Sequence, residues 1–159
     1  MIDSSQQGTQ VRTLVRESSA SDEEWIAAMR MQAREEMRAR RGGLRLVAEI
    51  SSSVRALDRD RSSWANLVAV VEDVPAGYVK GRSFDGRGIV EELYVDPCFR
   101  SIGLGSELFE AITVALADHG CHEVDVVALP GDRSFKNILE AYGFKARAIV
   151  YASSQRTQS

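Results

Sequence analysis

The chain has 159 residues, of which 44% are hydrophobic, and a formal net charge of −3 with a pI near 5.5. This length and composition suit one domain with an ordinary core, and the acidic balance argues against a general nucleic-acid binder. Two cysteines are too few for a disulfide framework or a closed zinc site, so no metal centre is expected. No apolar run approaches about 18 residues, and the N-terminal residues are mostly polar. We therefore expect neither a membrane span nor a secretory signal, and hence a soluble cytoplasmic protein.

The first half of the chain shows signals for one strand and two helices. The expected elements are a flexible tail over residues 1–10, a strand over Val11–Arg16, a helix from Ser21–Glu24 to Gly42–Gly43 and a second helix over Leu44–Asp58. The first helix has an acidic first turn. Its apolar stripe at helical spacing consists of Trp25, Met29, Ala33 and Met37. Successive serines at Ser51–Ser53 argue against the second helix, because serine favours caps over helix interiors.

The second half shows strands separated by turns, with two further helices. The expected elements are strands over Asn66–Val71, Gly77–Arg82 and Ile89–Val95, a helix that begins near Gly103, a strand over Glu123–Leu129, a short helix from Pro130–Arg133 to Tyr142–Phe144, a strand over Ala146–Ala152 and a free end over residues 153–159. Turns at Val74–Gly77 and Asp85–Gly88 make the first three strands an antiparallel meander. The strand–helix–strand succession that follows should make its two strands parallel neighbours. We therefore expect an α/β domain (an α+β mixed sheet) with helices on both faces.

One arginine and two glycines occupy the passage from the strand Ile89–Val95 into the next helix. They are Arg100, Gly103 and Gly105. Glycine lets a backbone approach a ligand closely, and the first N–H groups of a helix point outward at the positive end of its dipole. The passage is therefore a place for a pyrophosphate. Its spacing is neither that of a P-loop, which needs Gly-Lys-Ser/Thr, nor that of the three-glycine dinucleotide fingerprint.

The segment Arg100–Gly105, which follows Val95-Asp96-Pro97, resembles the acetyl-coenzyme A motif Arg/Gln-x-x-Gly-x-Gly/Ala of the GNAT N-acetyltransferase family. Ser101 stands where many members have glycine, which is a mild departure. The resemblance implies a GNAT-type acyl-CoA N-acyltransferase fold in a single domain over residues 11–152, with acetyl-CoA as co-substrate. The cofactor-binding residues that it implies are Leu93, Tyr94, Val95, Arg100, Ser101, Ile102, Gly103, Leu104, Gly105, Ser106, Asp132 and Lys136.

Glu91 and Glu92 are adjacent charges in an otherwise apolar strand and are the candidate catalytic residues. Acetyl transfer requires a group that takes the amine's proton, directly or through water. A strand buried on both faces cannot bury two charges cheaply, so at least one should face a polar cleft. In the family an acidic residue in this part of the strand serves as base or amine anchor, and a β-bulge there often breaks simple alternation. We rank Glu91 slightly above Glu92; the alternative, in which both face solvent, stays open.

The helix before Gly143–Phe144 departs from the family pattern. Members commonly have a tyrosine four residues before this glycine, placed to protonate the coenzyme thiolate, but here that residue is Leu139. Tyr142 adjoins the glycine and is out of phase for that role. Asp132 falls closest to the family's usual asparagine at the start of the helix. A dedicated general acid is therefore not evident, although water can serve because a coenzyme A thiol is acidic enough.

The segment between the first two strands borders the acceptor pocket in the family. Its basic run Arg38–Arg41 could attract an acidic substrate or the cofactor's phosphates, or be a solvated helix end. The leading hypothesis is acetyl-CoA-dependent N-acetylation of a primary amine on a small molecule, peptide or protein. The alternatives are a coenzyme A-binding module with lost or weak catalysis, and a regulatory protein that acts on charged tRNA, which the net charge disfavours. The expected partners are acetyl-CoA and an amine acceptor, without nucleic acid or membrane; a homodimer stays open.

Overall fold

A computed structural model of the chain describes residues 11–47, 64–129 and 132–147, which form a five-stranded sheet in the order β1-β2-β3-β4-β5. The strands are β1 Thr13–Glu17, β2 Trp64–Val71, β3 Val74–Phe84, β4 Arg87–Val95 and β5 Glu123–Val126. The helices are α1 Glu23–Arg38, α3 Leu104–Asp118 and α4 Arg133–Ala141, with 3₁₀ turns η1 Ala20–Asp22 and η3 Pro97–Phe99. Neighbouring strands are antiparallel except β4 and β5, which are parallel across α3. The expected mixed sheet, with its meander and parallel crossover, is confirmed.

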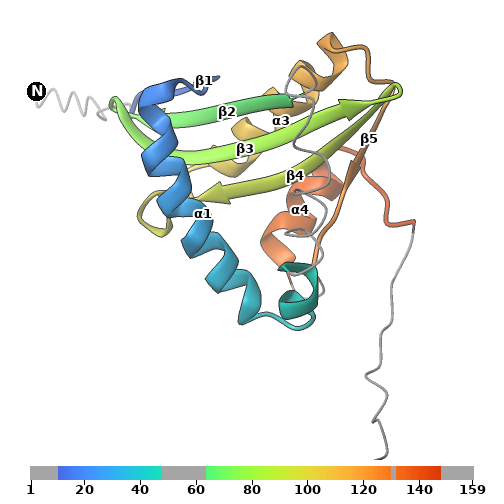
Figure 1. The fold of residues 1–159 in the computed structure, drawn as a ribbon, viewed down its shortest axis with the longest axis horizontal. Helices are drawn as coiled ribbons and strands as arrows, with labels where there is room; N and C mark the ends of the chain where they lie inside the picture. Colours follow the sequence, from blue (N-terminus) through green and yellow to red (C-terminus); the bar gives the residue numbers. More distant parts are fainter. Residues whose placement is uncertain (1–10, 48–63, 130–131, 148–159) are drawn as a thin grey trace, which may run out of the picture.

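Helices cover both faces of the sheet, because the strands direct alternate apolar side chains to opposite sides (Figure 1). On β2, Val68 and Val70 belong to the cluster under α1, whereas Leu67 and Ala69 belong to the cluster under α3. The apolar stripe of α1 contributes Trp25, Met29 and Ala33 to the first cluster. The stripe of α3 is buried in the second at Leu104, Leu108, Ile112 and Leu116. Three of the four residues of the α1 stripe expected from the sequence therefore pack on the sheet, and the fourth, Met37, lines the cavity described below.

The hairpin turns are tighter than the sequence predicts. Glu72 and Asp73 alone form the turn between β2 and β3, with φ angles of 47° and 69°. The predicted turn over Val74–Gly77 is wrong, because these residues belong to β3. The register between β3 and β2 shifts by one residue there, so Pro75-Ala76-Gly77 forms a β-bulge within the strand.

Several predicted elements extend beyond the described residues. Residues 43–47 are helical and fall at the start of the helix predicted over Leu44–Asp58, whose remainder lies outside the described ranges. Residues 146–147 are not in a strand, and the rest of the strand predicted over Ala146–Ala152 is likewise outside them. The predicted tails also lie outside, so the domain boundaries stay a prediction. In the described ranges, no helix is long and apolar enough to cross a membrane.

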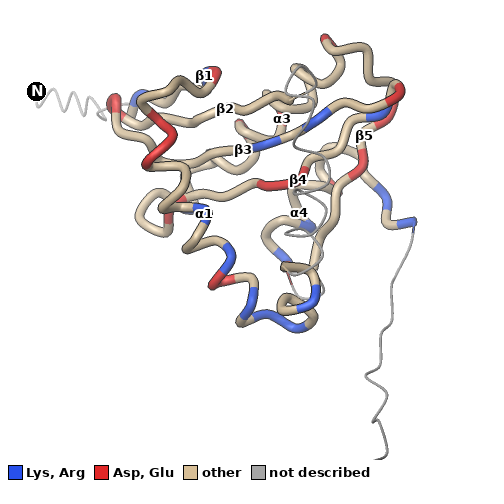
Figure 2. The backbone as a smooth tube through the Cα atoms, in the orientation of Figure 1, with Lys and Arg blue, Asp and Glu red and all other residues tan. Residues whose placement is uncertain are grey.

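The start of α1 is anchored to β1 by a partly buried ion pair between Arg16 and Asp22. Asp22 is 3% exposed and accepts hydrogen bonds from the Arg16 guanidinium at 2.7 and 2.9 Å. The N–H of Ser19 adds a third bond at 2.8 Å. The bonds from Arg16 outweigh the effect of burial and hold the pKa of Asp22 well below its usual range. Basic residues gather at the other end of α1 (Figure 2), close to the site described next.

Candidate active site

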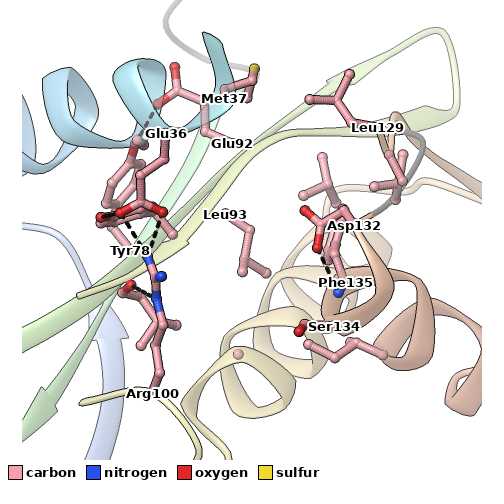
Figure 3. Close-up of a pocket in the computed structure, with 18 of the residues that line it drawn as sticks. Glu36, Met37, Tyr78, Glu92, Leu93, Arg100, Leu129, Asp132, Ser134 and Phe135 are labelled. Carbon is pink, nitrogen blue, oxygen red and sulfur yellow. Dashed lines mark hydrogen bonds and ion pairs between the residues drawn. The ribbon is translucent and has the colours of Figure 1, made fainter. Parts of the chain in front are cut away.

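A cavity of about 520 Å³ lies between α1, the C-terminal half of β4 and the N-termini of α3 and α4 (Figure 3). The residues that line it include Arg30, Arg34, Glu36 and Met37 of α1 and Arg40 just after it; Val90 to Val95 of β4; Arg100, Ser101, Gly103, Leu104, Gly105 and Ser106 at the start of α3; and Asp132, Ser134, Phe135 and Ile138 at α4. The cavity therefore joins most of the predicted cofactor residues to both candidate catalytic glutamates. Within the described ranges, no group of three or more His, Cys, Asp or Glu could hold a metal ion.

The two parallel strands separate along one side of this cavity. The last residues paired between β4 and β5 are Val90 and Val126, so β4 continues to Val95 without a described partner on that side. The Asp96 N–H donates to Ala76 O at 2.9 Å. Because hydrogen-bonded pairs alternate along an antiparallel ladder, Leu93 and Val95 direct their N–H and C=O groups away from β3, into the gap. The gap therefore offers an extended ligand strand backbone that pairs with no described strand, where only Val95 O already accepts from a side chain, that of Arg100.

The turn after β4 places the N-terminus of α3 at the end of the gap. Gly103 is the N-cap and has a φ of 94°, a conformation that favours glycine. Its carbonyl accepts from the N–H groups of Ser106 and Glu107, while no described residue accepts from those of Leu104 and Gly105. Ser101 precedes the N-cap by two residues and has a φ of 71°. Free N–H groups at a helix N-terminus form an anion site.

Gly105 has a packing role in addition to its place in the motif. A Cβ at this position would lie 3.1 Å from Cδ1 of Ile138, so its absence lets α3 and α4 approach closely. A bulky substitution here would disturb the helix packing as well as any ligand at the turn.

A β-bulge brings Glu91 and Glu92 to the same face of the sheet. The partner of Lys80 is Glu92 and that of Gly81 is Val90, so Glu91 is the extra residue. Val90 and Leu93 both pack toward α3, which leaves the two glutamates between them on the α1 side. Simple alternation, by which they would face opposite sides, does not hold here. Both glutamates line the cavity.

Glu92 is held by two partners. Its Oε2 accepts from Arg30 Nε at 2.8 Å and from the Tyr78 hydroxyl at 3.1 Å. Burial and the neighbouring Glu92 charge raise the pKa of Tyr78 well above its usual value, so the phenol stays a hydrogen-bond donor. The Glu92 charge is therefore neutralised by Arg30 and fixed in position.

Glu91 keeps one carboxylate oxygen available. Its Oε1 accepts from Nε of Arg82, but its Oε2 is buried with no hydrogen-bond donor among the described residues. A buried carboxylate oxygen without a donor is costly unless something completes its hydrogen bonding. Since the Glu91 side chain lines the cavity, a rotation of its carboxylate would let a ligand N–H do so.

A third carboxylate, Glu36 of α1, was missed by the sequence reasoning. It binds Arg100 Nη2 at 2.9 and 3.1 Å and accepts from the Tyr94 hydroxyl. Burial alone would raise the pKa of Glu36, but the hydrogen bonds from Tyr94 and Arg100 outweigh it and lower the pKa. Arg100 also donates through Nε to Val95 O at 3.0 Å and lies over the Tyr94 ring. The motif arginine is thus folded back into the cavity and neutralised by α1 (Figure 3).

An ion pair between Arg40 and Asp132 links α1 to α4 beside the cavity. Asp132 also caps α4 by accepting from the Phe135 N–H at 3.2 Å. Of the predicted cofactor residues, Ile102 and Lys136 do not line the cavity, and Lys136 instead pairs with Glu140 on the exposed side of α4.

The helix α4 supplies no tyrosine to the cavity. Leu139, at the family's tyrosine position, packs against the core under α3. Tyr142 donates to Glu110 at 3.2 Å and packs edge-on against Phe109. Burial, followed by the Glu110 charge, raises the pKa of Tyr142. Tyr142 therefore contributes to the contact between α3 and α4, which agrees with the expectation that it is out of phase for protonating the thiolate.

Residues 23–144 match the family model described as the acetyltransferase (GNAT) family. No curated protein matches the chain. Aminoglycoside acetyltransferase AAC(6')-Iy in complex with a CoA bisubstrate analog superposes with a TM-score of 0.64 at 18% identity, covering 91% of this chain and 99% of that one. A ribosomal-protein-alanine N-acetyltransferase from Brucella melitensis biovar Abortus gives 0.64 at 15%, covering 90% and 99%. An aminoglycoside acetyltransferase from an uncultured soil metagenomic sample, in complex with sisomicin, gives 0.63 at 14%, covering 91% and 97%.

A mixed sheet that opens between two parallel strands, next to a helix N-terminus, defines the acyl-CoA N-acyltransferase fold. The superpositions support that fold, and at their low identities they show the fold alone. The family match spans most of the chain, from the start of α1 to the residue after Gly143. The chain belongs to the acetyltransferase (GNAT) family.

Proposed function

We propose that the protein is an acetyl-CoA-dependent N-acetyltransferase that acts on a primary amine of a small molecule, peptide or protein by direct attack on the thioester. The observation that carries the proposal is the gap beside β4. The gap runs from the turn before α3, whose N–H groups suit a phosphate, to Glu91, whose Oε2 lacks a hydrogen-bond donor among the described residues. A strand-like cofactor arm and an amine nucleophile would meet where this gap reaches the bulge.

The cofactor half of the cavity fits acetyl-CoA in shape and in hydrogen bonding. The outward backbone groups of Leu93 and Val95 suit the amide groups of a pantetheine arm, which can pair as an extra strand does. The N–H groups of Leu104 and Gly105 suit the pyrophosphate. Acetyl-CoA supplies the activated acetyl thioester. Because Arg100 now donates to Val95 O, its side chain must move for the arm to reach that carbonyl.

We assign proton transfer to Glu91. An amine attacks a thioester only as the neutral species, so the site must accept a proton. The buried Oε2 of Glu91 has no hydrogen-bond donor among the described residues, and the side chain lines the cavity, whereas Glu92 carries the Arg30 and Tyr78 bonds. Glu92 then serves to fix the bulge and the opposite wall. We propose that water protonates the departing coenzyme A thiolate, since neither Leu139 nor Tyr142 can supply a proton there.

The alternative of a coenzyme A-binding module without efficient catalysis is motivated by Leu139, and one experiment separates it from the enzyme. Acetyl-CoA binding is measured by calorimetry, and acetyl-CoA consumption is followed with a panel of primary amines. Binding together with amine-dependent consumption supports the enzyme, and binding without consumption supports the module. Absence of binding at millimolar acetyl-CoA would contradict both. The cytoplasmic location and a homodimer are not required by this chemistry and stay predictions.

A further inference from the structure

The arginines of the cavity differ in their partners. Arg30 pairs with Glu92, Arg40 with Asp132 and Arg100 with Glu36. Arg34 also lines the cavity and is half-buried, yet no described residue forms a hydrogen bond or ion pair with it. Within the described part of the cavity wall, Arg34 is thus an arginine whose charge is left unmatched.

The position of Arg34 on α1 places it on the acceptor side. Residues four apart lie on the same face of a helix. Arg30 and Arg34 form such a row on α1, and Arg30 binds Glu92 at the bulge. Glu36 belongs to a different face of α1 and pairs with Arg100 at the turn before α3, while Arg40, just beyond the end of α1, pairs with Asp132 at the start of α4, where we place the cofactor. Arg34 therefore extends the row that faces the reaction site, away from the cofactor's phosphates.

Among the described charged side chains that line the cavity, two accordingly keep an unmatched group once the ion pairs are set aside. One is the Glu91 Oε2, an acceptor for an N–H. The other is the Arg34 guanidinium, a forked donor that suits a carboxylate or a phosphate. A ligand that satisfies both carries an amine and, at some distance from it, an anionic group.

We propose that Arg34 is a specificity-determining residue that binds an anionic group of the acceptor, so that the preferred acceptors are amines bearing a carboxylate or a phosphate. This inference rests on the proposed acetyltransferase function and names the substrate class of the same site. Arg34 would make α1 the element that discriminates between acceptors, because an uncharged amine can form a hydrogen bond with Glu91 but leaves Arg34 without a partner.

Matched pairs of acceptors test the inference. Acetyl-CoA consumption is measured with β-alanine against β-alaninamide, with 4-aminobutyrate against its amide, and with phosphoethanolamine against ethanolamine. Each pair is run on the natural protein, Arg34→Gln, Arg34→Lys and the control Arg38→Gln. Arg38 lies on the same helix but is exposed, pairs with Glu35 and is not among the residues lining the cavity. For each acceptor, KM in a variant is first divided by KM in the natural protein, which cancels the basicity of that amine, and the resulting ratios are then compared within each pair.

The expected result is that Arg34→Gln raises KM for the anionic acceptors by about tenfold or more, the usual scale for a lost charge-assisted bond. It should leave kcat, the KM for acetyl-CoA and the KM for the uncharged partners nearly unchanged. Arg34→Lys should restore part of the affinity, and Arg38→Gln should change none of these values. A larger response to the phosphate or to the carboxylate pairs identifies which anion the site prefers.

Other outcomes overturn the inference. If the natural protein uses the uncharged amines as well as their anionic partners, Arg34 selects nothing, while the proposed function stands. If Arg34→Gln raises the KM for acetyl-CoA instead, the residue belongs to the cofactor half. If no amine of any pair consumes acetyl-CoA, the proposed function fails, and the inference fails with it. A thermal melt of each variant shows whether a loss reflects unfolding.

Discussion

The two halves of the cavity are built from different parts of the polypeptide. The cofactor half consists mainly of backbone, namely the outward groups of Leu93 and Val95 and the first N–H groups of α3. The acceptor half consists of charged side chains, with the arginines of α1 facing the glutamates of the β4 bulge. Backbone groups are present whatever the side chain, so the cofactor half should tolerate side-chain changes but respond to altered φ angles or an added Cβ. The acceptor half should respond in the opposite way.

The largest expected effect lies in the acceptor half. Glu91→Gln keeps the size of the side chain but removes the base, so turnover should fall by about 10²-fold or more, with acetyl-CoA affinity nearly unchanged. The deficit should shrink at high pH, where the free amine is already abundant. Steady-state rates over a pH series, with calorimetry for acetyl-CoA, measure both.

Tyr142→Phe serves as the control for Glu91→Gln, since its hydroxyl bonds Glu110 away from the cavity. It should cost little activity. Full activity in Glu91→Gln together with loss in Tyr142→Phe would show that the catalytic groups are misplaced, even if the cofactor half is correct.

Gly103→Ala tests the cofactor half. An alanine at a φ of 94° is strained by about 1–2 kcal/mol, and its Cβ, which has no protein atom within 4 Å, would occupy the space where we place phosphate. Acetyl-CoA affinity should fall by about tenfold, about 1.4 kcal/mol, with a smaller change in the amine KM. Calorimetry and thermal melts give affinity and stability on the same samples.

Gly86→Ala is a matched control, because Gly86 has a φ of 73° in a hairpin turn that does not line the cavity. It should show a similar loss of stability and unchanged acetyl-CoA affinity. Equal affinities in Gly103→Ala and Gly86→Ala would mean that Gly103 shapes the turn without contacting the cofactor.

Asp22→Asn addresses how α1 is held over the acceptor half. Loss of the partly buried ion pair with Arg16 should lower the free energy of unfolding near neutral pH by about 2 kcal/mol and raise the amine KM more than that for acetyl-CoA. Because the folded-state pKa of Asp22 is depressed, its contribution is present above the unfolded value of about 4 and is lost as pH falls through the folded pKa. The difference in stability from the natural protein should therefore narrow on acidification. A stability difference that is constant with pH would show that the ionised Asp22 carboxylate is not its source.

The smallest expected effect concerns the contact that joins the two halves. Glu36→Gln removes the charge that neutralises Arg100, which frees the guanidinium for phosphate and removes a nearby repulsive carboxylate. Acetyl-CoA affinity should rise about threefold, since a partly exposed ion pair contributes less than about 1 kcal/mol. The gain should fade with added salt. A drop in affinity would show that Glu36 positions Arg100 for the cofactor instead of competing for it.

The same division explains how much of the site could be predicted from the sequence. The turn from Arg100 to Gly105 is local, so residue spacing was enough to predict that a helix begins there, and the phosphate site at its start stays a prediction. The shared face of Glu91 and Glu92 depends on one extra residue in a ladder, which alternation alone does not reveal. Glu36 meets Arg100 across 64 residues of sequence, and nothing in the helical pattern around Glu36 names that partner.

The errors at the turns have a related cause. Pro75-Ala76-Gly77 has turn composition, yet the structure absorbs it as an irregularity within β3. Glu72 and Asp73 instead take positive φ angles, which glutamate rarely adopts. The ladder between β2 and β3 therefore sets the position of the turn, and it overrides the local preference of Pro75-Ala76-Gly77 for a turn.

Because Glu91 is the extra residue of the bulge, deleting it and substituting it would have different structural effects. A substitution would keep the bulge, whereas a deletion would remove it. Removing the whole residue would let β4 resume a regular ladder, with Glu92 still directed to α1 and Leu93 still directed to α3. The strand would lose one carboxylate and no other side chain would change layers. In genetic terms, a single added codon separates an ordinary antiparallel strand from one that presents adjacent acids to the same cavity.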